Sequence, residues 1–191
     1  MKLIVGLGNP GDLYAGSRHN VGFSVLKALS RGLKAPLKRD KGTFSLSARA
    51  KYAKQNLMLA MPLTFMNLSG NAVKDLVKKH RIDLDNLLVI CDDLDLEFAR
   101  LKIRPQGSSG GQRGLASIIE SLGSDKFARL RIGIGRPGKG PGTSAYVLSP
   151  FRGEEKKEMV KVVKRALECC QAWVDEGIIK AMDAFNKKGV Y

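Results

Sequence analysis

The chain has 191 residues, a length that fits one globular domain and leaves little room for a second hydrophobic core. Hydrophobic residues make up 43% of the sequence, which excludes a wholly disordered protein. The 33 lysines and arginines exceed the 18 acidic residues and give a formal net charge of +15, which points to a polyanionic partner: nucleic acid, an anionic membrane or an acidic protein.

The positive charge is concentrated in two segments. Residues 1–60 contain eleven Lys or Arg and two acids, and residues 98–140 contain nine bases and two acids. Acidic side chains gather between these segments, at Asp92, Asp93, Asp95 and Glu97. We interpret the two basic segments as a surface for an anionic partner; a generally solvated basic surface is the alternative.

The cysteines and the apolar segments indicate a cellular compartment. Cys91, Cys169 and Cys170 make no disulfide framework, because two of them are neighbours in sequence and their number is odd. The apolar run at residues 2–7 is too short for a signal peptide, and no apolar stretch approaches the ~20 residues that a membrane span needs. We therefore expect a soluble, cytoplasmic protein with no membrane partner.

The first half of the chain alternates between predicted strands and helices. The apolar run at 2–7 predicts a buried strand that ends in a Gly-Asn-Pro-Gly loop, and apolar residues at helical spacing predict a helix over 20–33. Alternation of apolar and polar residues predicts a strand pair at 43–50 and 56–61. A second helix is expected over 67–79, with Leu68 among its core-facing residues.

The second half continues this pattern. Its predicted elements are, in order, strand 87–91, strand 100–104, a Gly/Ser loop at 106–111, helix 114–122, strand 129–135, a Gly/Pro link at 139–143 and a long amphipathic helix at 154–176. The alternation predicts one α/β domain over residues 1–191, with a mixed, mainly parallel twisted sheet covered by helices on both faces. Sites in such sheets gather beyond the carboxyl ends of the strands, where Asn9, Asp92 and the residues after Gly135 are expected.

A glycine motif follows the first predicted strand. Gly6-x-Gly8-x-x-Gly11 matches the dinucleotide-binding fingerprint, which needs a helix that starts at its third glycine so that the pyrophosphate lies on the helix N-terminus. Helical spacing begins only near Asn20, and the acidic residue expected about twenty residues further on is missing. The sequence therefore argues against a Rossmann cofactor site.

The chain has two histidines, and its cysteines lack metal-ligand spacing, so we expect no metal site. His80 follows two lysines at a predicted helix end, where a cation suits the helix dipole, and we interpret it as structural. His19 lies in a polar stretch between the first loop and the next helix. We take His19 as a candidate for chemistry; a capping or surface role is the alternative.

Asp92 and Asp93 directly follow the apolar strand 87–91. A carboxylate at the mouth of a buried sheet costs free energy unless it is paired or hydrogen-bonded. Such an aspartate can accept the N–H of a histidine, which fixes the tautomer of the ring and makes it more basic. We therefore expect His19 and Asp92 to form a pair.

The sequence supplies no nucleophile for this pair. No serine lies in a G-x-S-x-G turn, and Cys91 lies within an apolar strand. The chemistry that remains is activation of a water by a general base, a role worth roughly 10²–10⁴ in rate. Neutral donors for a carbonyl group are available at Asn9, Asn20 and Asn67, for each of which a capping role is the alternative.

Together these stretches resemble the bacterial-type peptidyl-tRNA hydrolases, and the resemblance extends from Lys2 to about Phe185. The matching segments are, in order, Val5–Gly11 (Val-Gly-Leu-Gly-Asn-Pro-Gly), Tyr14, Arg18–Phe23 (Arg-His-Asn-Val-Gly-Phe), Pro62–Gly70 (Pro-Leu-Thr-Phe-Met-Asn-Leu-Ser-Gly), Asp92–Leu96 (Asp-Asp-Leu-Asp-Leu) and Arg129–Pro137 (Arg-Leu-Arg-Ile-Gly-Ile-Gly-Arg-Pro). No single segment is decisive, but their common order and spacing are a strong signal.

The resemblance implies a role for each matching site residue. It implies that His19 is the general base and that Asp92 holds it in its basic form. It implies that Asn9 and Asn67 bind the peptide end, with Asn9 selecting blocked over free aminoacyl groups. The remaining implied positions are Tyr14 and Phe65 near the tRNA 3′ end, and Arg104 and Arg131 as the clamp on the tRNA 5′ phosphate. The family needs no metal or organic cofactor, and we expect a monomer with tRNA as its partner.

One segment departs from the family. Where many members read Gly-Gly-His-Asn-Gly, this chain has Gly110-Gly111-Gln112-Arg113-Gly114. The asparagine that Arg113 replaces contacts tRNA and water in the family; we expect Arg113 to bind the tRNA 3′ end, with a solvent-facing arginine as the alternative. Gln112 keeps the ability to form hydrogen bonds without titrating.

Three functions compete at this point. The leading one is hydrolysis of the ester bond between peptide and tRNA in peptidyl-tRNA, with a histidine base that activates water, so that tRNA is recycled. The alternative is a non-catalytic RNA-binding protein on the same fold, like the chloroplast splicing factors related to the family. A nucleotide-dependent oxidoreductase is the third, and it would retain NAD(P). The enzyme is favoured because His19, Asp92, Asn9 and Asn67 are all present.

Overall fold

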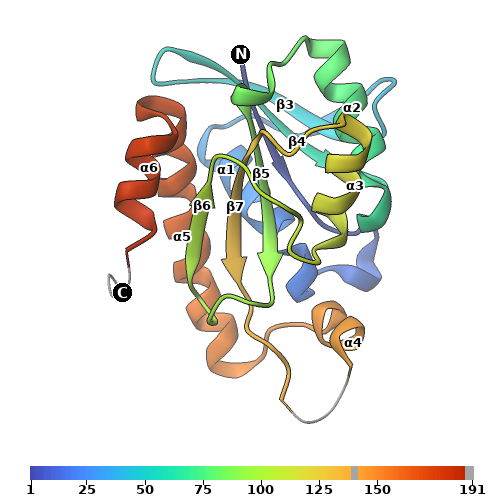
Figure 1. Cartoon of the computed structure of the whole chain (residues 1–191), viewed down its shortest axis with the longest axis vertical. Coiled ribbons are helices and arrows are strands. Elements are labelled where there is room, and N and C mark those ends of the chain that lie inside the picture. The colour runs from blue at the N-terminus through green and yellow to red at the C-terminus, as the bar shows by residue number, and fades with distance from the viewer. Residues whose placement is uncertain (139–141, 188–191) are drawn as a thin grey trace.

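The strands form one twisted sheet with helices on both faces (Figure 1). The computed structural model describes residues 1–138 and 142–187, and within them the sheet has seven strands in the order β2-β3-β4-β1-β5-β7-β6. Their bounds are β1 Lys2–Gly6, β2 Lys38–Asp40, β3 Ser45–Tyr52, β4 Gln55–Pro62, β5 Leu87–Asp93, β6 Leu101–Arg104 and β7 Ala128–Gly133. The central strands β4, β1, β5 and β7 are parallel, whereas β3 and β6 join them through antiparallel pairing.

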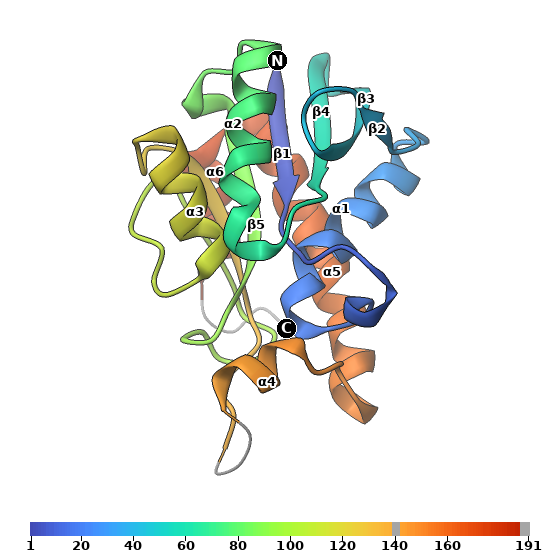
Figure 2. The same ribbon diagram turned by 90° about the vertical axis from the view of Figure 1, so that its right-hand side faces the viewer.

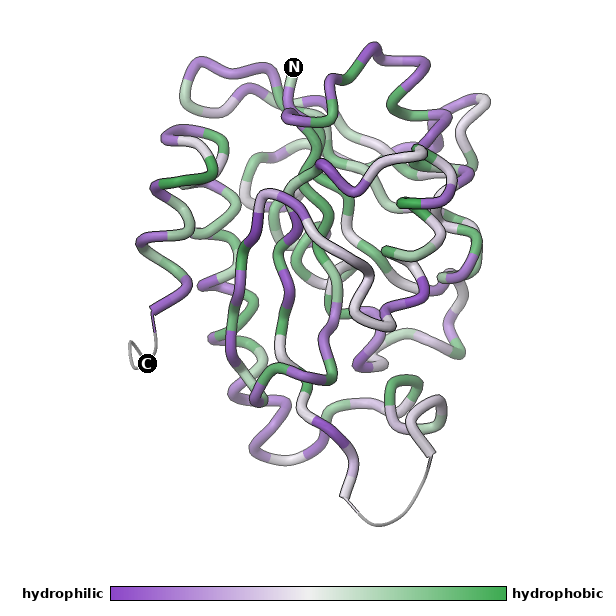
Figure 3. The backbone as a smooth tube through the Cα atoms, viewed as in Figure 1, coloured by the Kyte–Doolittle hydropathy of each residue, from purple (hydrophilic) through white to green (hydrophobic). Residues whose placement is uncertain are grey.

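The central strands are buried on both faces, which explains their continuous apolar runs. In β1, Ile4 packs with one core cluster, while its neighbours Leu3 and Val5 pack with the other. Figure 3 shows hydrophobic residues in the interior strands, while β6 and β7 alternate between hydrophobic and hydrophilic residues. The sheet therefore separates two hydrophobic cores, and its edge beside β6 is polar on one face.

The helices lie in two layers (Figure 2). On one face lie α1 (Val21–Gly32), α5 (Gly153–Glu176) and α6 (Ile178–Phe185); on the other lie α2 (Ser69–His80) and α3 (Arg113–Leu122). The short helix α4 (Thr143–Leu148) lies beyond the carboxyl ends of β5 and β7 (Figure 1). None of the helices in the described residues is long and apolar enough to cross a bilayer.

The architecture confirms the predicted α/β fold with a mixed, mainly parallel sheet covered on both faces. Three elements are absent from the sequence prediction: β2, α4 and α6. β2 has the sequence Lys-Arg-Asp, without an apolar signal, and is a strand because β3 pairs with it. Within the predicted link, residues 139–141 lie outside the described residues, and Thr143 already begins α4.

Two further details differ from the prediction. Leu68 does not join the core face of α2, because it precedes the helix in a 3-10 turn and is exposed. β5 extends to Asp93, so Asp92 and Asp93 are the last two residues of the strand and not the first residues after it. Their backbones pair with β7, and consecutive residues of a strand point to opposite faces.

A buried carboxylate joins the β2–β3 corner to the end of α2. Asp40 accepts hydrogen bonds from Ser47 Oγ at 2.9 Å and Lys79 Nζ at 2.5 Å, and His80 Nε2 lies 3.3 Å from it. Burial by itself raises the pKa of Asp40, but these hydrogen bonds outweigh it and lower the pKa to about 2. The cluster therefore stabilises the folded state at pH values above the pKa of an ordinary carboxyl group.

Replacing Asp40 by Asn should lower the free energy of unfolding at pH 7 by about 2 kcal/mol, because a carboxyl whose pKa falls from 3.8 to about 2 on folding contributes that much above its unfolded pKa. In the unmodified protein this contribution is lost as the pH falls from about 4 to about 2, and the variant should lack that part of the acid dependence. Urea unfolding over a pH series measures both effects. The exposed Asp85→Asn is the control, and identical curves for Asp40→Asn and wild type would contradict the assignment.

Candidate active site

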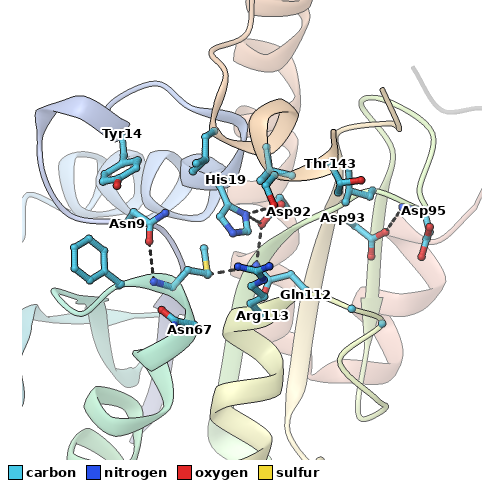
Figure 4. A pocket seen from close by; sticks show the side chains of 18 of the residues that line it. Asn9, Tyr14, His19, Asn67, Asp92, Asp93, Asp95, Gln112, Arg113 and Thr143 are labelled. Atoms are coloured by element: carbon cyan, nitrogen blue, oxygen red, sulfur yellow. Dashed lines mark hydrogen bonds and ion pairs between the residues drawn. The ribbon is translucent and has the colours of Figure 1, made fainter. Parts of the chain in front are cut away.

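A cavity of about 510 Å³ opens beyond the carboxyl ends of the central strands (Figure 4). The loops that follow β1 and β4, together with the end of β5 and the residues just after it, supply most of its polar lining, as expected for a parallel sheet. Seven of the predicted site residues line it: Asn9, Tyr14, His19, Phe65, Asn67, Asp92 and Arg113. The structure thus brings together residues from four separate stretches of the sequence. Arg104 and Arg131 do not line the cavity and are described below.

His19 and Asp92 form a buried pair in this cavity. His19 lies in the 3-10 turn Arg18–Asn20 before α1, and its Nδ1 lies 2.9 Å and 2.8 Å from the two carboxylate oxygens of Asp92. Because an ionised carboxylate only accepts hydrogen bonds, Nδ1 carries the proton in the neutral ring. Nε2 is then the basic nitrogen, and no side chain or backbone group of the described residues is hydrogen-bonded to it. The pair can take a proton from a water in the cavity.

Asp92 is also held from the opposite side of the sheet. Gln112 Nε2 donates a 2.9 Å hydrogen bond to Asp92 Oδ1, and Gln112 Oε1 accepts from Leu115 N–H at 2.8 Å as the N-cap of α3. The carboxylate is only 2% exposed, and these donors compensate for the loss of water around it. Sequence reasoning had assigned Gln112 no role beyond retained hydrogen bonding, because nothing along the chain relates it to Asp92.

Asn9 is fixed by its neighbours so that one group remains for a ligand. Its backbone N–H and C=O pair with the side chain of Asn20 at 2.8 Å and 2.9 Å. Its Oδ1 accepts from Met66 N–H at 2.7 Å, so Nδ2 is the end of the amide that is left to donate. Asn20 therefore holds Asn9 in place, and its own amide is used in that contact. Asn67, in the 3-10 turn Met66–Leu68, is exposed at the cavity.

The cavity has an aromatic wall. The rings of Tyr14 and Phe65 meet edge to face, with centroids 6.5 Å apart. Phe65 is 55% exposed, so its ring is accessible from the cavity. Figure 4 shows Tyr14 beside Asn9 at the cavity, away from the His19–Asp92 pair. This wall offers flat apolar surface next to the polar centre.

Arg18 is a buried arginine that sequence reasoning did not single out. Its guanidinium binds both oxygens of Glu155, at 3.1 Å and 2.7 Å, and lies over the rings of Tyr146 and Phe151. Its backbone N–H donates to Ser149 C=O at 3.0 Å. Arg18 therefore joins the turn that carries His19 to α4 and to the segment that follows it. Residues of α4 line the cavity. The sequence signals for Arg18 are its position beside His19 and its place in the family-like segment Arg18–Phe23.

The two arginines predicted as a phosphate clamp lie on the polar face of β6 and β7. Arg104 is exposed at the end of β6, and Arg131 is hydrogen-bonded through Nε to Asp93. Lys102 lies between them: burial and then the nearby charges of Arg104 and Arg131 lower its pKa. Leu101 and Ile103 face the core on the other side of β6, so the cations share the face that α2 and α3 leave uncovered.

The loop before α3 covers part of this basic face. Arg129 is 2% exposed and donates to the backbone carbonyls of Gly107, Ser108 and Asp125. It therefore fixes the Gly/Ser loop that leads to Gln112 and Arg113. Arg113 is the first residue of α3, is exposed, and lines the cavity.

The glycines of the apparent dinucleotide motif have a packing role. A Cβ on Gly6 would lie 2.3 Å from Gly22 O, and one on Gly8 would lie 2.6 Å from the ring of Phe23. They allow α1 to lie against the end of β1. Gly11 has a φ of 97° and precedes a 3-10 turn, while α1 begins only at Val21, so no helix N-terminus lies at the third glycine. This geometry does not support the dinucleotide site, in agreement with the sequence argument.

Known proteins match the chain over nearly its whole length. The sequence profile of the family described as Peptidyl-tRNA hydrolase matches residues 3–190. Among curated relatives, the peptidyl-tRNA hydrolase of Desulforudis audaxviator is 47% identical and the match covers 97% of this chain and 93% of that protein; that of Geobacillus kaustophilus is 44% identical, with 98% and 100% covered.

Solved structures agree with the sequence matches. A crystal structure of peptidyl-tRNA hydrolase from Acinetobacter baumannii superposes with a TM-score of 0.91 at 34% identity, covering 97% of this chain and 94% of that one. A crystal structure of a peptidyl-tRNA hydrolase in complex with N-propanol gives a TM-score of 0.93 at 33% identity, with 100% and 97% covered. With the His19–Asp92 pair at the carboxyl end of a sheet of this shape, the matches lead to one conclusion: the chain belongs to the peptidyl-tRNA hydrolase family.

Proposed function

We propose that His19, oriented by Asp92, is the general base with which this enzyme hydrolyses the ester between a peptide, or an N-blocked amino acid, and tRNA. The observation that carries the proposal is the pair of contacts from His19 Nδ1 to the Asp92 carboxylate, at 2.9 Å and 2.8 Å, which leaves Nε2 basic and directed to the cavity. Family membership supplies the substrate class.

The reaction follows from these positions. A water hydrogen-bonded to His19 Nε2 gives up a proton as its oxygen attacks the ester carbonyl carbon, and the resulting imidazolium is stabilised by Asp92. When the tetrahedral intermediate collapses, the bond to the 3′ oxygen of tRNA breaks, and the imidazolium can return the proton to that oxygen. The products are the free carboxylic acid and tRNA with a 3′ hydroxyl group.

The asparagines supply neutral donors for the peptide. Asn9 Nδ2 is left free to donate because Oδ1 is occupied by Met66 N–H, and Asn67 is exposed at the same cavity. An amide donor grips a carbonyl oxygen without taking the proton that His19 transfers. This arrangement suits a substrate whose amino group is blocked, since a blocked group offers a carbonyl where a free one carries a charge.

The basic residues bind the tRNA in this proposal. Arg113 takes the 3′ end, Arg104 and Arg131 take the 5′ phosphate, and the rings of Tyr14 and Phe65 line the site near the terminal base. A guanidinium matches phosphate oxygens through its planar fork. The formal charge of +15 supports a polyanionic substrate.

We further propose that residues 1–191 act as one domain, as a monomer and in the cytoplasm. One sheet contains all strands of the described residues, which supports a single folding unit. The three cysteines are free and buried, which fits a reducing compartment.

His19→Ala should reduce kcat by roughly 10²–10⁴, because it removes the only proton acceptor proposed for the water. Release of the blocked amino acid from N-acetylaminoacyl-tRNA measures the rate. His80→Ala is the matched control, since His80 contacts Asp40 outside the cavity. Near-normal turnover by His19→Ala would exclude His19 as the base. A wild-type protein that binds tRNA and releases nothing would favour the non-catalytic RNA-binding alternative.

Asp92→Asn should cost at least about tenfold in kcat, because an amide no longer fixes the tautomer with the proton on Nδ1. In the wild type, activity should fall as the pH is lowered and His19 becomes protonated, since the imidazolium cannot accept a proton. The pH–rate profiles of both proteins test this. An Asp92→Asn variant with the wild-type rate and profile would contradict the role of the carboxylate.

Arg104→Ala and Arg131→Ala should each weaken tRNA binding and flatten the slope of log affinity against log salt by roughly 0.7–0.9, the value for one phosphate contact. Both should also reduce the preference for tRNA that carries a 5′ phosphate. Arg131→Lys keeps the charge next to Asp93 and separates loss of the fork from loss of charge. Lys54→Ala, in the β3–β4 turn, is the control. Unchanged slopes in both alanine variants would place the clamp elsewhere.

Arg113→Asn should weaken tRNA affinity while changing the maximum rate by less than about tenfold, or ~1.4 kcal/mol. Removing this cation from the cavity should also move the acid limb of the pH–rate profile to higher pH, because a like charge opposes protonation of His19. Arg113→Lys should retain part of the affinity. A variant indistinguishable from wild type in affinity and pH profile would show that Arg113 faces solvent only.

A further inference from the structure

The N-cap of α3 makes two hydrogen bonds with opposite ends of one side chain. Gln112 Oε1 accepts from Leu115 N–H at 2.8 Å, which satisfies a donor of the first helical turn. The acceptor end of the amide is thereby committed to the helix. Nε2, the donor end, must then face Asp92 Oδ1, which it meets at 2.9 Å. The orientation of this amide is fixed by its surroundings, because a flipped amide would place two donors, or two acceptors, opposite each other.

Gln112 and His19 approach Asp92 from different layers of the fold. His19 precedes α1, which packs on one face of the sheet, and Gln112 caps the start of α3, which packs on the other. Figure 4 shows the carboxylate of Asp92 between the two side chains. Asp92 therefore has hydrogen-bond donors on two sides. Rotation of its side chain, or movement of either helix layer, would change the contact between Asp92 and His19.

The same amide also reaches the asparagine side of the cavity. Nε2 lies 3.5 Å from Met66 Sδ, a weak hydrogen bond, and Met66 N–H is the group that orients Asn9. Gly114 permits this close packing: a Cβ there would lie 2.5 Å from Met66 Sδ and 3.0 Å from Gln112 Oε1. Gln112 thus contacts both the carboxylate that orients the proposed base and the residue whose N–H orients Asn9.

We propose that Gln112 is a positioning residue: it holds the Asp92 carboxylate toward His19 Nδ1 and makes that orientation depend on the folded N-terminus of α3. This inference rests on the proposed roles of His19 and Asp92. Gln112, which departs from the family pattern, thereby has a specific role. This role differs from that of the neighbouring Arg113, which faces the cavity.

Glutamine has a chemical advantage in this position. Its N–H groups donate at every pH, so the contact to Asp92 does not change with protonation. A histidine would donate only in a suitable protonation state or tautomer and would place a second titrating group beside the first. Gln112 therefore adds no protonation of its own to the pH–rate profile.

The test separates the contact with Asp92 from the cap. Gln112→Met has similar length and can neither cap nor donate. Gln112→Ser can cap α3 but is too short to reach Asp92. Gln112→His can donate to Asp92. Gln112→Glu keeps an acceptor for the cap and turns a second carboxylate toward Asp92. For each protein we would measure kcat, KM and the pH–rate profile with N-acetylaminoacyl-tRNA, the thermal midpoint, and the ¹⁵N chemical shifts of the His19 ring, which report its tautomer.

The proposal predicts a specific pattern. Gln112→Met and Gln112→Ser should both lose about tenfold or more in kcat with KM changed less than about twofold, while only Gln112→Met should lose thermal stability. Gln112→His should keep most of the wild-type kcat and add the protonation of a second group to the pH–rate profile. Gln112→Glu should lose rate and shift the acid limb to higher pH, because two adjacent carboxylates favour bound protons.

Two results would overturn the proposal. One is a Gln112→Ser protein with the wild-type kcat, profile and His19 tautomer, which would reduce Gln112 to a cap. The other is an unchanged His19 tautomer in Gln112→Met. The ¹⁵N measurement does not need turnover, so it tests the positioning role even if the wild-type protein proves inactive. Failure of the proposed function is recognised separately, by full activity of His19→Ala.

Discussion

The rest of the site depends on one buried contact, that between the Asp92 carboxylate and His19 Nδ1. Asp92 is only 2% exposed, and burying its carboxylate without hydrogen-bond donors would cost free energy. The donors come from both layers that cover the sheet, His19 on one side and Gln112 on the other. Asp92 is therefore stable only when both layers are packed, and in return it fixes the ring whose Nε2 faces the cavity. The same contacts serve stability and the proposed chemistry, so a change in the packing of either helix layer would alter the position of His19.

The approach of α1 to the sheet makes this contact possible. Gly6 and Gly22 bring the backbones together: a Cβ on Gly22 would lie 2.5 Å from Ile90 O, two residues before Asp92. Phe23 N–H donates to Leu7 C=O at 3.1 Å and fixes the start of the helix over the end of β1. The turn that carries His19 immediately precedes this helix, so the glycines set the distance from His19 to β5. The motif that resembles a phosphate-binding loop thus supports the proposed site through packing.

Much of this could be predicted from the sequence, and the limits have a physical cause. Continuous apolar runs identified β1 and β5, and the rule for parallel sheets placed Asn9 and Asp92 at the same edge. The contacts of Arg18 and Gln112 could not be predicted, because side-chain hydrogen-bond partners depend on which layers meet in the folded protein. α4 and β2 escaped notice for a related reason: neither has a periodic apolar pattern, and each is held by contacts with other segments. Asn20, considered as a ligand donor, is used in holding Asn9.

Two pairs of neighbouring residues divide the work of the proposed site. Asp92 and Asp93 end the same strand, but the alternation of side chains directs Asp92 to His19 and Asp93 to Arg131. Gln112 is the N-cap of α3 and Arg113 is its first residue, with Gln112 turned to Asp92 and Arg113 at the cavity. In the proposed function, Asp92 and Gln112 act on the ester through His19, whereas Asp93 and Arg113 act on the tRNA. Because Asp93 neutralises part of the charge of Arg131, while the exposed Arg104 has no carboxylate partner among the ion pairs of the described residues, the two arginines are not equivalent toward phosphate. In the proposed function, Arg104 would contribute its whole charge to attraction at a distance, and Arg131 would contribute a guanidinium held in a fixed orientation by Asp93.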